Sequence, residues 1–131
     1  MSSIGYKDMK VLRSLFTKAW HPKLIALLLW MVVRYSKDPI LFTQGYEKRN
    51  YPSPHDTDPL QAFDLRSGTF EDPEAVVADV NSCWVYDRDR PDMKVAIYHD
   101  TGRGIHLHLQ VCFKTEYIGG QCDILSKTTQ V

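Results

Sequence analysis

The sequence predicts an α+β fold in which N-terminal helices pack on a small antiparallel sheet. Two helical segments come first, and two strand patterns form a hairpin near the other end of the chain. The elements between them do not alternate as a β-α-β repeat, which excludes a regular parallel sheet. The 131 residues, 44% of them hydrophobic, predict one domain with its own core over residues 1–131.

Two helices are expected before residue 40. Apolar residues recur at helical spacing over residues 7–20, and the pair His21-Pro22 interrupts the pattern. Pro22 suits the first position of a second helix over residues 22–36, because its missing N–H would have no partner there. This second segment is apolar on nearly all sides, which predicts deep burial.

Strands and a long loop follow. Residues 40–43 are expected to form a short buried strand, and residues 47–60, with their prolines and charges, form a loop. Residues 61–65 alternate as a strand, which places Ala62 and Asp64 on the same face. A long loop that carries a histidine in a small domain is more often functional than decorative.

The last elements are a helix and a hairpin. Asp72 is a good N-cap for a helix that ends near Cys83, because a proline and a glutamate follow it in the first turn. Residues 94–99 and 105–113 predict the two strands of a hairpin. The weakly patterned end of the chain could add an edge strand near residues 123–125.

Composition limits the function classes. Sixteen basic residues balance sixteen acidic ones, which argues against a nucleic-acid surface. The longest apolar run, residues 24–33, is half the length that a membrane-spanning helix needs, and the N-terminus lacks a signal-peptide pattern. Three cysteines without a CxxC pair are expected to be reduced thiols. We therefore expect a cytoplasmic monomer with no membrane partner.

The segment Gly104-Ile105-His106-Leu107-His108-Leu109-Gln110-Val111 is the most informative part of the chain. Residues two apart in a strand share a face, so His106 and His108 project side by side. The alternate residues Ile105, Leu107, Leu109 and Val111 are expected to point the other way, into the core. His55 and Asp64 stand in separate upstream segments. Two imidazoles, a carboxylate and a spare histidine are the components of a catalytic zinc site with an open fourth position.

Three motifs occur in a familiar order. They are Ser53-Pro54-His55, Ala62-Phe63-Asp64 and His106-Leu107-His108, preceded by Phe42-Thr43-Gln44-Gly45-Tyr46. With these motifs the chain resembles the zinc peptidase superfamily that joins D-alanyl-D-alanine carboxypeptidases, phage endolysin peptidases and the hedgehog signalling domain. The resemblance covers roughly residues 40–113 and implies a hedgehog- or DD-peptidase-like fold.

The resemblance implies a role for each site residue. His55, Asp64 and His108 would be the zinc ligands, and His106 would be catalytic rather than a ligand. Substrate or oxyanion contacts would come from the strand-and-turn segment and from nearby arginines, namely Gln44, Tyr46, Arg49 and Arg66. Lys48 is a further substitute for the arginine that the family carries after its Gly-Tyr turn, where this chain has Glu47.

The chain departs from the family pattern at two other places. Six residues, Asp56 to Gln61, separate the first histidine from the alanine, where the family has four. The carboxypeptidase branch has a glutamate three residues before the last histidine, where this chain has Ile105. Without that glutamate, the site needs another base, and His106 is the nearest one by sequence.

The leading interpretation is a small zinc peptidase that hydrolyses amide bonds of peptidoglycan stem peptides containing D-amino acids. It would be phage-encoded or phage-like and released to the cell wall by a holin-type route. Endopeptidase and carboxypeptidase activity both stay open. The alternatives are a zinc-binding interaction module of the same fold without turnover, as in hedgehog, and a virion structural protein without metal.

Overall fold

A five-stranded sheet forms the centre of the computed structural model, which describes residues 2–100 and 104–119. The strand order is β1-β2-β3-β6-β5. In chain order the strands are β1 (Ile4–Tyr6), β2 (Ile40–Gln44), β3 (Ala62–Arg66), β5 (Ala96–Asp100) and β6 (Ile105–Gln110). The predicted α+β class and the predicted hairpin, formed by β5 and β6, are confirmed.

The sheet is mixed, so the prediction of a purely antiparallel sheet is wrong. Strand β1 pairs parallel with β2, with Ile4 opposite Ile40, whereas the other pairs in this sheet are antiparallel. The two helices between β1 and β2 carry the chain back to the same end of the sheet, as a parallel pair requires. We expected a helix from residue 7 and no strand before it.

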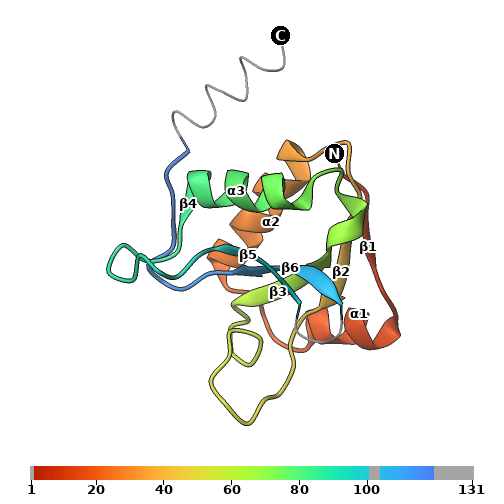
Figure 1. The fold of residues 1–131 in the computed structure, drawn as a ribbon. Helices are drawn as coiled ribbons and strands as arrows, with labels where there is room; N and C mark the ends of the chain where they lie inside the picture. Colours follow the sequence, from red (N-terminus) through yellow and green to blue (C-terminus); the bar gives the residue numbers. More distant parts are fainter. Residues whose placement is uncertain (1, 101–103, 120–131) are drawn as a thin grey trace.

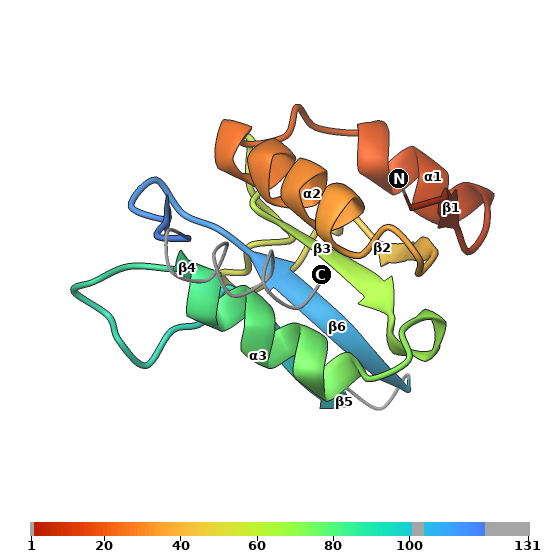
Figure 2. The same cartoon turned by 90° about the horizontal axis from the view of Figure 1, so that it is seen from above.

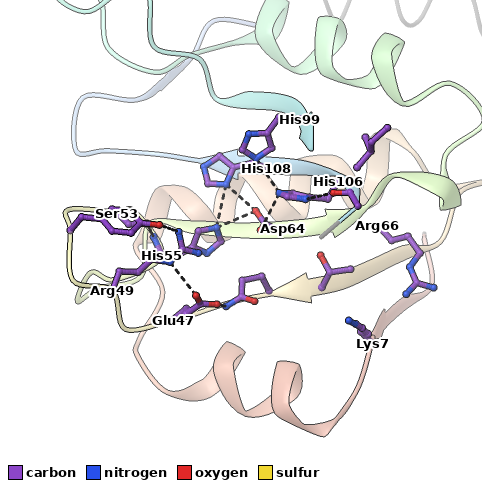
Figure 3. Close-up of a pocket in the computed structure, with 15 residues that line it drawn as sticks. Lys7, Glu47, Arg49, Ser53, His55, Asp64, Arg66, His99, His106 and His108 are labelled. Atoms are coloured by element: carbon purple, nitrogen blue, oxygen red, sulfur yellow. Dashed lines mark hydrogen bonds and ion pairs between the residues drawn. The ribbon is translucent and has the colours of Figure 1, made fainter. Parts of the chain in front are cut away.

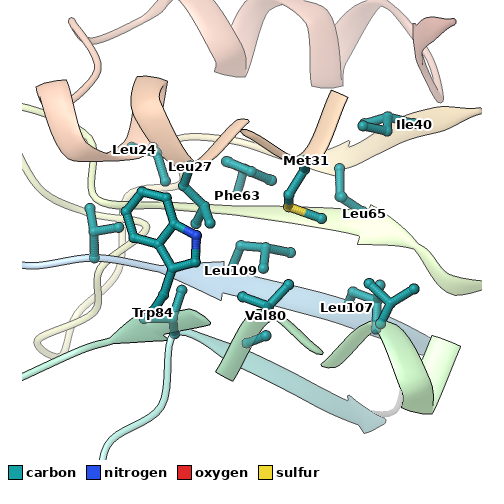
Figure 4. Packing of buried hydrophobic residues seen from close by; sticks show 14 of the residues in the cluster. Leu24, Leu27, Met31, Ile40, Phe63, Leu65, Val80, Trp84, Leu107 and Leu109 are labelled. Carbon is teal, nitrogen blue, oxygen red and sulfur yellow. The ribbon is translucent and has the colours of Figure 1, made fainter. Parts of the chain in front are cut away.

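Two helices cover one face of the sheet (Figure 1). They are α2 (Pro22–Arg34) and α3 (Pro73–Cys83); Figure 2 views the sheet from this side and shows β3 and β6 between the two helices. Leu27 and Met31 of α2 meet Phe63 and Leu65 of β3 in a buried apolar layer, to which α3 adds Val80 (Figure 4). Burial of such side chains is the main stabilising contribution to the fold.

Helix α2 is buried on one side only, which corrects the expectation of deep burial all round. Leu24 and Leu27 are fully buried, but Ile25, Leu29 and Val33 are exposed. These three follow one another at intervals of four residues, so they form one stripe along the outer side of the helix. The apolar run at this point therefore does not predict a helix surrounded by protein.

Each of the three helices begins at a residue whose side chain caps it, and of these caps Asp72 was expected. Asp8 accepts a hydrogen bond from the Val11 amide and starts α1 (Met9–Phe16). This helix is shorter than the predicted 7–20, because Asp8 is its cap and the helix ends at Phe16. His21 caps α2 by accepting from the Lys23 amide, and Asp72 caps α3. Helix α1 lies beside β2 at the edge of the sheet (Figure 1).

A second, two-stranded sheet joins β4 (Trp84–Val85) to β7 (Glu116–Tyr117), and the sequence patterns did not predict it. The expected edge strand at residues 123–125 lies outside the described residues.

None of the described helices is long and apolar enough to cross a membrane. Cys83 is disulfide-bonded, so the expectation of three reduced thiols is wrong, whereas Cys112 is free and buried.

Candidate metal centre

Strand register brings the polar side chains of the sheet together on the face opposite α2 and α3. Asp64 on β3 lies directly opposite His108 on β6 and opposite Gln44 on β2. One step further along, His106 lies opposite His99 on β5. Residues two apart in a strand share a face. Strands β3, β6 and β5 therefore carry adjacent rows of polar side chains on this face.

The loop after β2 brings His55 to the same place. The Glu47 amide donates to the His55 carbonyl at 3.0 Å, and the Gln61 amide donates to the Pro54 carbonyl at 3.3 Å. The His55 ring then lies below the sheet with Nδ1 2.8 Å from the Gly45 carbonyl oxygen. The two extra residues in this loop, relative to the family pattern, do not keep His55 from the sheet.

Three side-chain atoms converge at this point (Figure 3). Asp64 Oδ1 lies 3.1 Å from His55 Nε2 and 2.9 Å from His108 Nδ1. The two ring nitrogens lie 3.3 Å from each other. All three residues are buried, and among the described residues they form the one group of histidine, cysteine and acidic side chains placed to hold a metal ion.

The outer nitrogens of both rings face hydrogen-bond acceptors. His55 Nδ1 faces the Gly45 carbonyl, and His108 Nε2 lies 2.9 Å from the Gln110 side-chain oxygen. The Gln110 amide nitrogen donates to the Lys94 carbonyl at 2.8 Å, which fixes the oxygen toward His108. Neutral rings therefore carry their protons on these outer nitrogens, and both inner nitrogens turn lone pairs toward the carboxylate.

This donor set fits a divalent metal. Three lone-pair atoms without a proton between them repel one another unless a cation or added protons lie among them. Zinc prefers histidine nitrogen and carboxylate oxygen, and bonds of about 2.0–2.1 Å place tetrahedral ligand atoms roughly 3.3–3.4 Å apart. The observed separations of 2.9, 3.1 and 3.3 Å are close to that spacing.

Electrostatics favour an ionised Asp64. When no cation lies among the three atoms, the inner ring nitrogens can carry protons and donate to this carboxylate. Burial by itself would raise the pKa of the Asp64 carboxyl group, but these hydrogen bonds from His108 and His55 outweigh burial and hold the pKa well below its ordinary value. The side chain is therefore a carboxylate at neutral pH. A buried carboxylate between two imidazoles has the charge that a metal cation requires.

His106 stands next to this group without being part of it. Its Nε2 lies 3.4 Å from Asp64 Oδ2 and 3.0 Å from His99 Nε2. Burial, together with the nearby His106 and His108, lowers the pKa of His99, so the His99 ring is neutral at neutral pH. His99 thus supports His106 from the neighbouring strand.

An open cavity of about 440 Å³ lies over the three converging residues. Gln44, Arg49 and Arg66 line it, as the resemblance implied. Tyr46 does not line this cavity. It lines a neighbouring one and hydrogen-bonds with Asp56, so the structure does not bring it to the converging residues as expected.

Two further lining residues bear on the chemistry. Ile105, at the position where the carboxypeptidase branch has glutamate, is 51% exposed at the rim of the cavity. The prediction that it points into the core is wrong, because Ile105 is the first residue of β6 and its side chain stays exposed. Arg49 lies within 3.3 Å of the Glu47 carboxylate, and its guanidinium also donates to the Tyr51 hydroxyl.

Sequence reasoning missed two supporting residues, Gln110 and Gly45. Gln110 shares the strand face of His108, two residues away, so the same alternation that identified the histidine pair could have found it. Gly45 acts through its carbonyl. No side-chain pattern signals this contact, because it depends on how separate segments pack together.

No protein-family model, curated protein or solved structure matches the chain.

Proposed function

We propose that the protein is a zinc-dependent peptidase that hydrolyses amide bonds in peptidoglycan stem peptides. The carrying observation is the convergence of Asp64 Oδ1, His55 Nε2 and His108 Nδ1, with both outer ring nitrogens facing acceptors. The motif resemblance supplies the substrate class and the hedgehog- or DD-peptidase-like fold type. The three converging residues are the ones that the three motifs of the resemblance contain.

Each residue has a defined part in this proposal. His55, Asp64 and His108 would hold the zinc, which when bound supplies an activated water and polarises the substrate carbonyl. Gly45 and Gln110 keep both rings turned with their lone pairs inward. The fourth position would open toward the cavity, where a peptide has access.

His106 is the residue best placed to move a proton. Its side chain lies in the cavity wall, 14% exposed, beside the Asp64 carboxylate. Its Nε2 is within 3.0 Å of the neutral His99 ring, which holds the imidazole in position. A proton can therefore pass between His106 and a group bound in the cavity, a role that Ile105 cannot fill.

Metal content measured after purification without chelators tests the site. We expect one zinc per chain in the wild-type protein and none in His55→Ala, Asp64→Ala or His108→Ala. His21→Asn is the matched control, because it removes a histidine outside the site and keeps a side-chain acceptor for the cap of α2. Wild-type protein that neither contains zinc nor takes it up would contradict the proposal.

Turnover is tested separately, by release of new amino groups from purified peptidoglycan. We expect His106→Ala to keep its zinc and to lose roughly 100- to 10,000-fold in kcat, the usual contribution of a general acid–base group. Equal turnover in His106→Ala and wild type would remove His106 from the mechanism.

Ile105 supports a second candidate function, a zinc-binding module without turnover. An exposed apolar side chain at the rim of the cavity adds contact area for a partner but no base. This alternative predicts zinc in the wild-type protein, its loss in the three ligand variants and no peptidoglycan hydrolysis at any metal concentration. The two measurements above therefore separate the two functions.

A further inference from the structure

A second cavity, of about 550 Å³, continues from the metal cavity along the end of β2 toward α1. Both cavities are lined by Lys7, Thr43, Gln44 and Glu47, so they form one groove. A ligand held over the metal centre can therefore extend past β2 to the side of α1.

The second cavity is cationic although the chain as a whole has equal numbers of acidic and basic residues. Its lining includes four basic residues, Lys7, Lys10, Arg13 and Lys48. All four are exposed, and none of them makes an ion pair with another described residue. Elsewhere on the described surface, cations such as Lys114 and Arg88 have acidic partners.

The two acidic residues in the same lining are occupied locally. Asp8 accepts a hydrogen bond from the Val11 amide as the N-cap of α1. Glu47 accepts from the Gln44 side chain at 2.6 Å and pairs with Arg49. Neither carboxylate lies in an ion pair with the four cations, so the cavity offers positive charge to whatever enters it.

We propose that this cavity is a binding subsite for a carboxylate-bearing part of the peptide ligand. The groove leads from the metal centre, so an extended peptide with one amide over the metal places neighbouring residues against α1. Lys7, Lys10 and Arg13 would pair with carboxylates there. The ligand class is therefore an acidic peptide, and naming it as the substrate rests on the proposed peptidase function.

Binding of a simple acidic peptide tests the subsite without requiring metal or turnover. Triglutamate is titrated into the ¹⁵N-labelled protein, with triglutamine and inorganic phosphate as comparison probes. We expect saturable amide shifts in α1 and in residues 43–48 with triglutamate, and no saturable shifts with triglutamine. Higher salt should weaken the binding, because exposed charge pairs are screened.

A charge-matched pair of double variants checks the location. Lys10→Gln with Arg13→Gln removes two exposed cations from α1 and keeps good helix formers, so the fold is retained. We expect the Kd for triglutamate to rise roughly two- to thirty-fold, as for the loss of two exposed ion pairs. Lys37→Gln with Lys114→Gln makes the same change in net charge outside both cavities, and should leave the Kd within about 1.5-fold.

Several outcomes would overturn the subsite. Equal binding of triglutamine, equal loss in the control double variant, shifts confined to other elements, or binding of phosphate without triglutamate would each contradict it. If triglutamate binds as expected but the protein holds no zinc, the peptidase proposal fails and the acidic-peptide site remains. If zinc and hydrolysis are found but triglutamate does not bind, only the subsite fails.

Discussion

Gln110 fixes the orientation of the His108 ring at the candidate metal centre. Its side-chain oxygen lies 2.9 Å from His108 Nε2, and its amide nitrogen is tied to the Lys94 carbonyl. The amide therefore cannot turn its NH₂ group toward the ring without losing its own acceptor. A buried histidine held in this way has one tautomer and one orientation, and both are needed for a metal ligand.

Replacing Gln110 should weaken zinc binding without removing a ligand. In Gln110→Ala, His108 Nε2 loses its acceptor, and the zinc Kd should rise about 10- to 100-fold. Gln110→Glu restores an acceptor for Nε2–H and should recover part of the affinity. A chelator-competition titration measures both values, and melting temperatures in excess zinc show that both variants are folded. Unchanged affinity in Gln110→Ala would mean that the residue only packs beside the ring.

At this scale the sequence predicts which three residues converge better than it predicts the residues that support them. Alternation along one strand pairs His106 with His108, and the motif order selects His55 and Asp64. Gln44, Arg49 and Arg66 line the cavity, and their contacts with a substrate stay a prediction. The position of His99 follows from hairpin register, which side-chain patterns do not encode.

The contact between α1 and the end of β2 sets the position of the Gly45 carbonyl. The Gly45 amide donates to the Ser14 hydroxyl at 3.0 Å, and the Tyr46 amide donates to the Ser14 carbonyl at 3.0 Å. A Cβ at Gly45 would lie 2.9 Å from the backbone of Ser14. Glycine thus allows α1 to approach the strand closely while its own carbonyl reaches His55.

Gly45→Ala should therefore act on stability and metal binding together. The methyl group must push α1 away from β2, which we expect to cost about 1–3 kcal/mol of unfolding free energy. The same movement withdraws the carbonyl from His55 Nδ1 and should raise the zinc Kd. Denaturant unfolding and zinc titration of the same sample measure the two effects.

Gly68→Ala is the matched control for this variant. An added Cβ at Gly68 meets no described atom within 4 Å, so its unfolding free energy should stay within about 0.5 kcal/mol of wild type. If Gly45→Ala is as stable as Gly68→Ala, the close approach of α1 is not a constraint on the site.

Elements with a strong local signal were predicted, and those defined by pairing were not. Capping residues and apolar spacing located α2 and α3 to within a few residues. Strand β1 was missed because it is three residues long and two of them are exposed at the sheet edge. Its parallel pairing with β2 depends on the path of the two helices between them, which no local pattern specifies.

The molecule as a whole separates stability from chemistry. One face of the sheet packs against α2 and α3 and contains the apolar core, whereas the other face carries the histidines and Asp64 (Figures 3 and 4). The two faces meet only through the strands that supply both. Asp64 and His108 lie on β3 and β6, which also contribute to the core. Changes in the candidate metal centre can therefore alter the unfolding free energy of the whole protein.

Removal of the metal should lower the melting temperature of the wild-type protein. A ligand bound only by the native state stabilises it by about 4 kcal/mol at a thousandfold excess over its Kd. For a chain of this size that corresponds to a shift of roughly 10–20 °C. Calorimetry with and without a chelator measures the shift.

His55→Ala is the comparison that assigns this shift to the proposed centre. Without His55 the native state loses one of its three metal ligands, so the chelator should lower the melting temperature by no more than about 2 °C. Readdition of zinc should restore the wild-type value and leave the variant unchanged. A chelator shift of equal size in both proteins would place the stabilising metal elsewhere in the chain, and no shift in the wild type would contradict zinc as its resident cofactor.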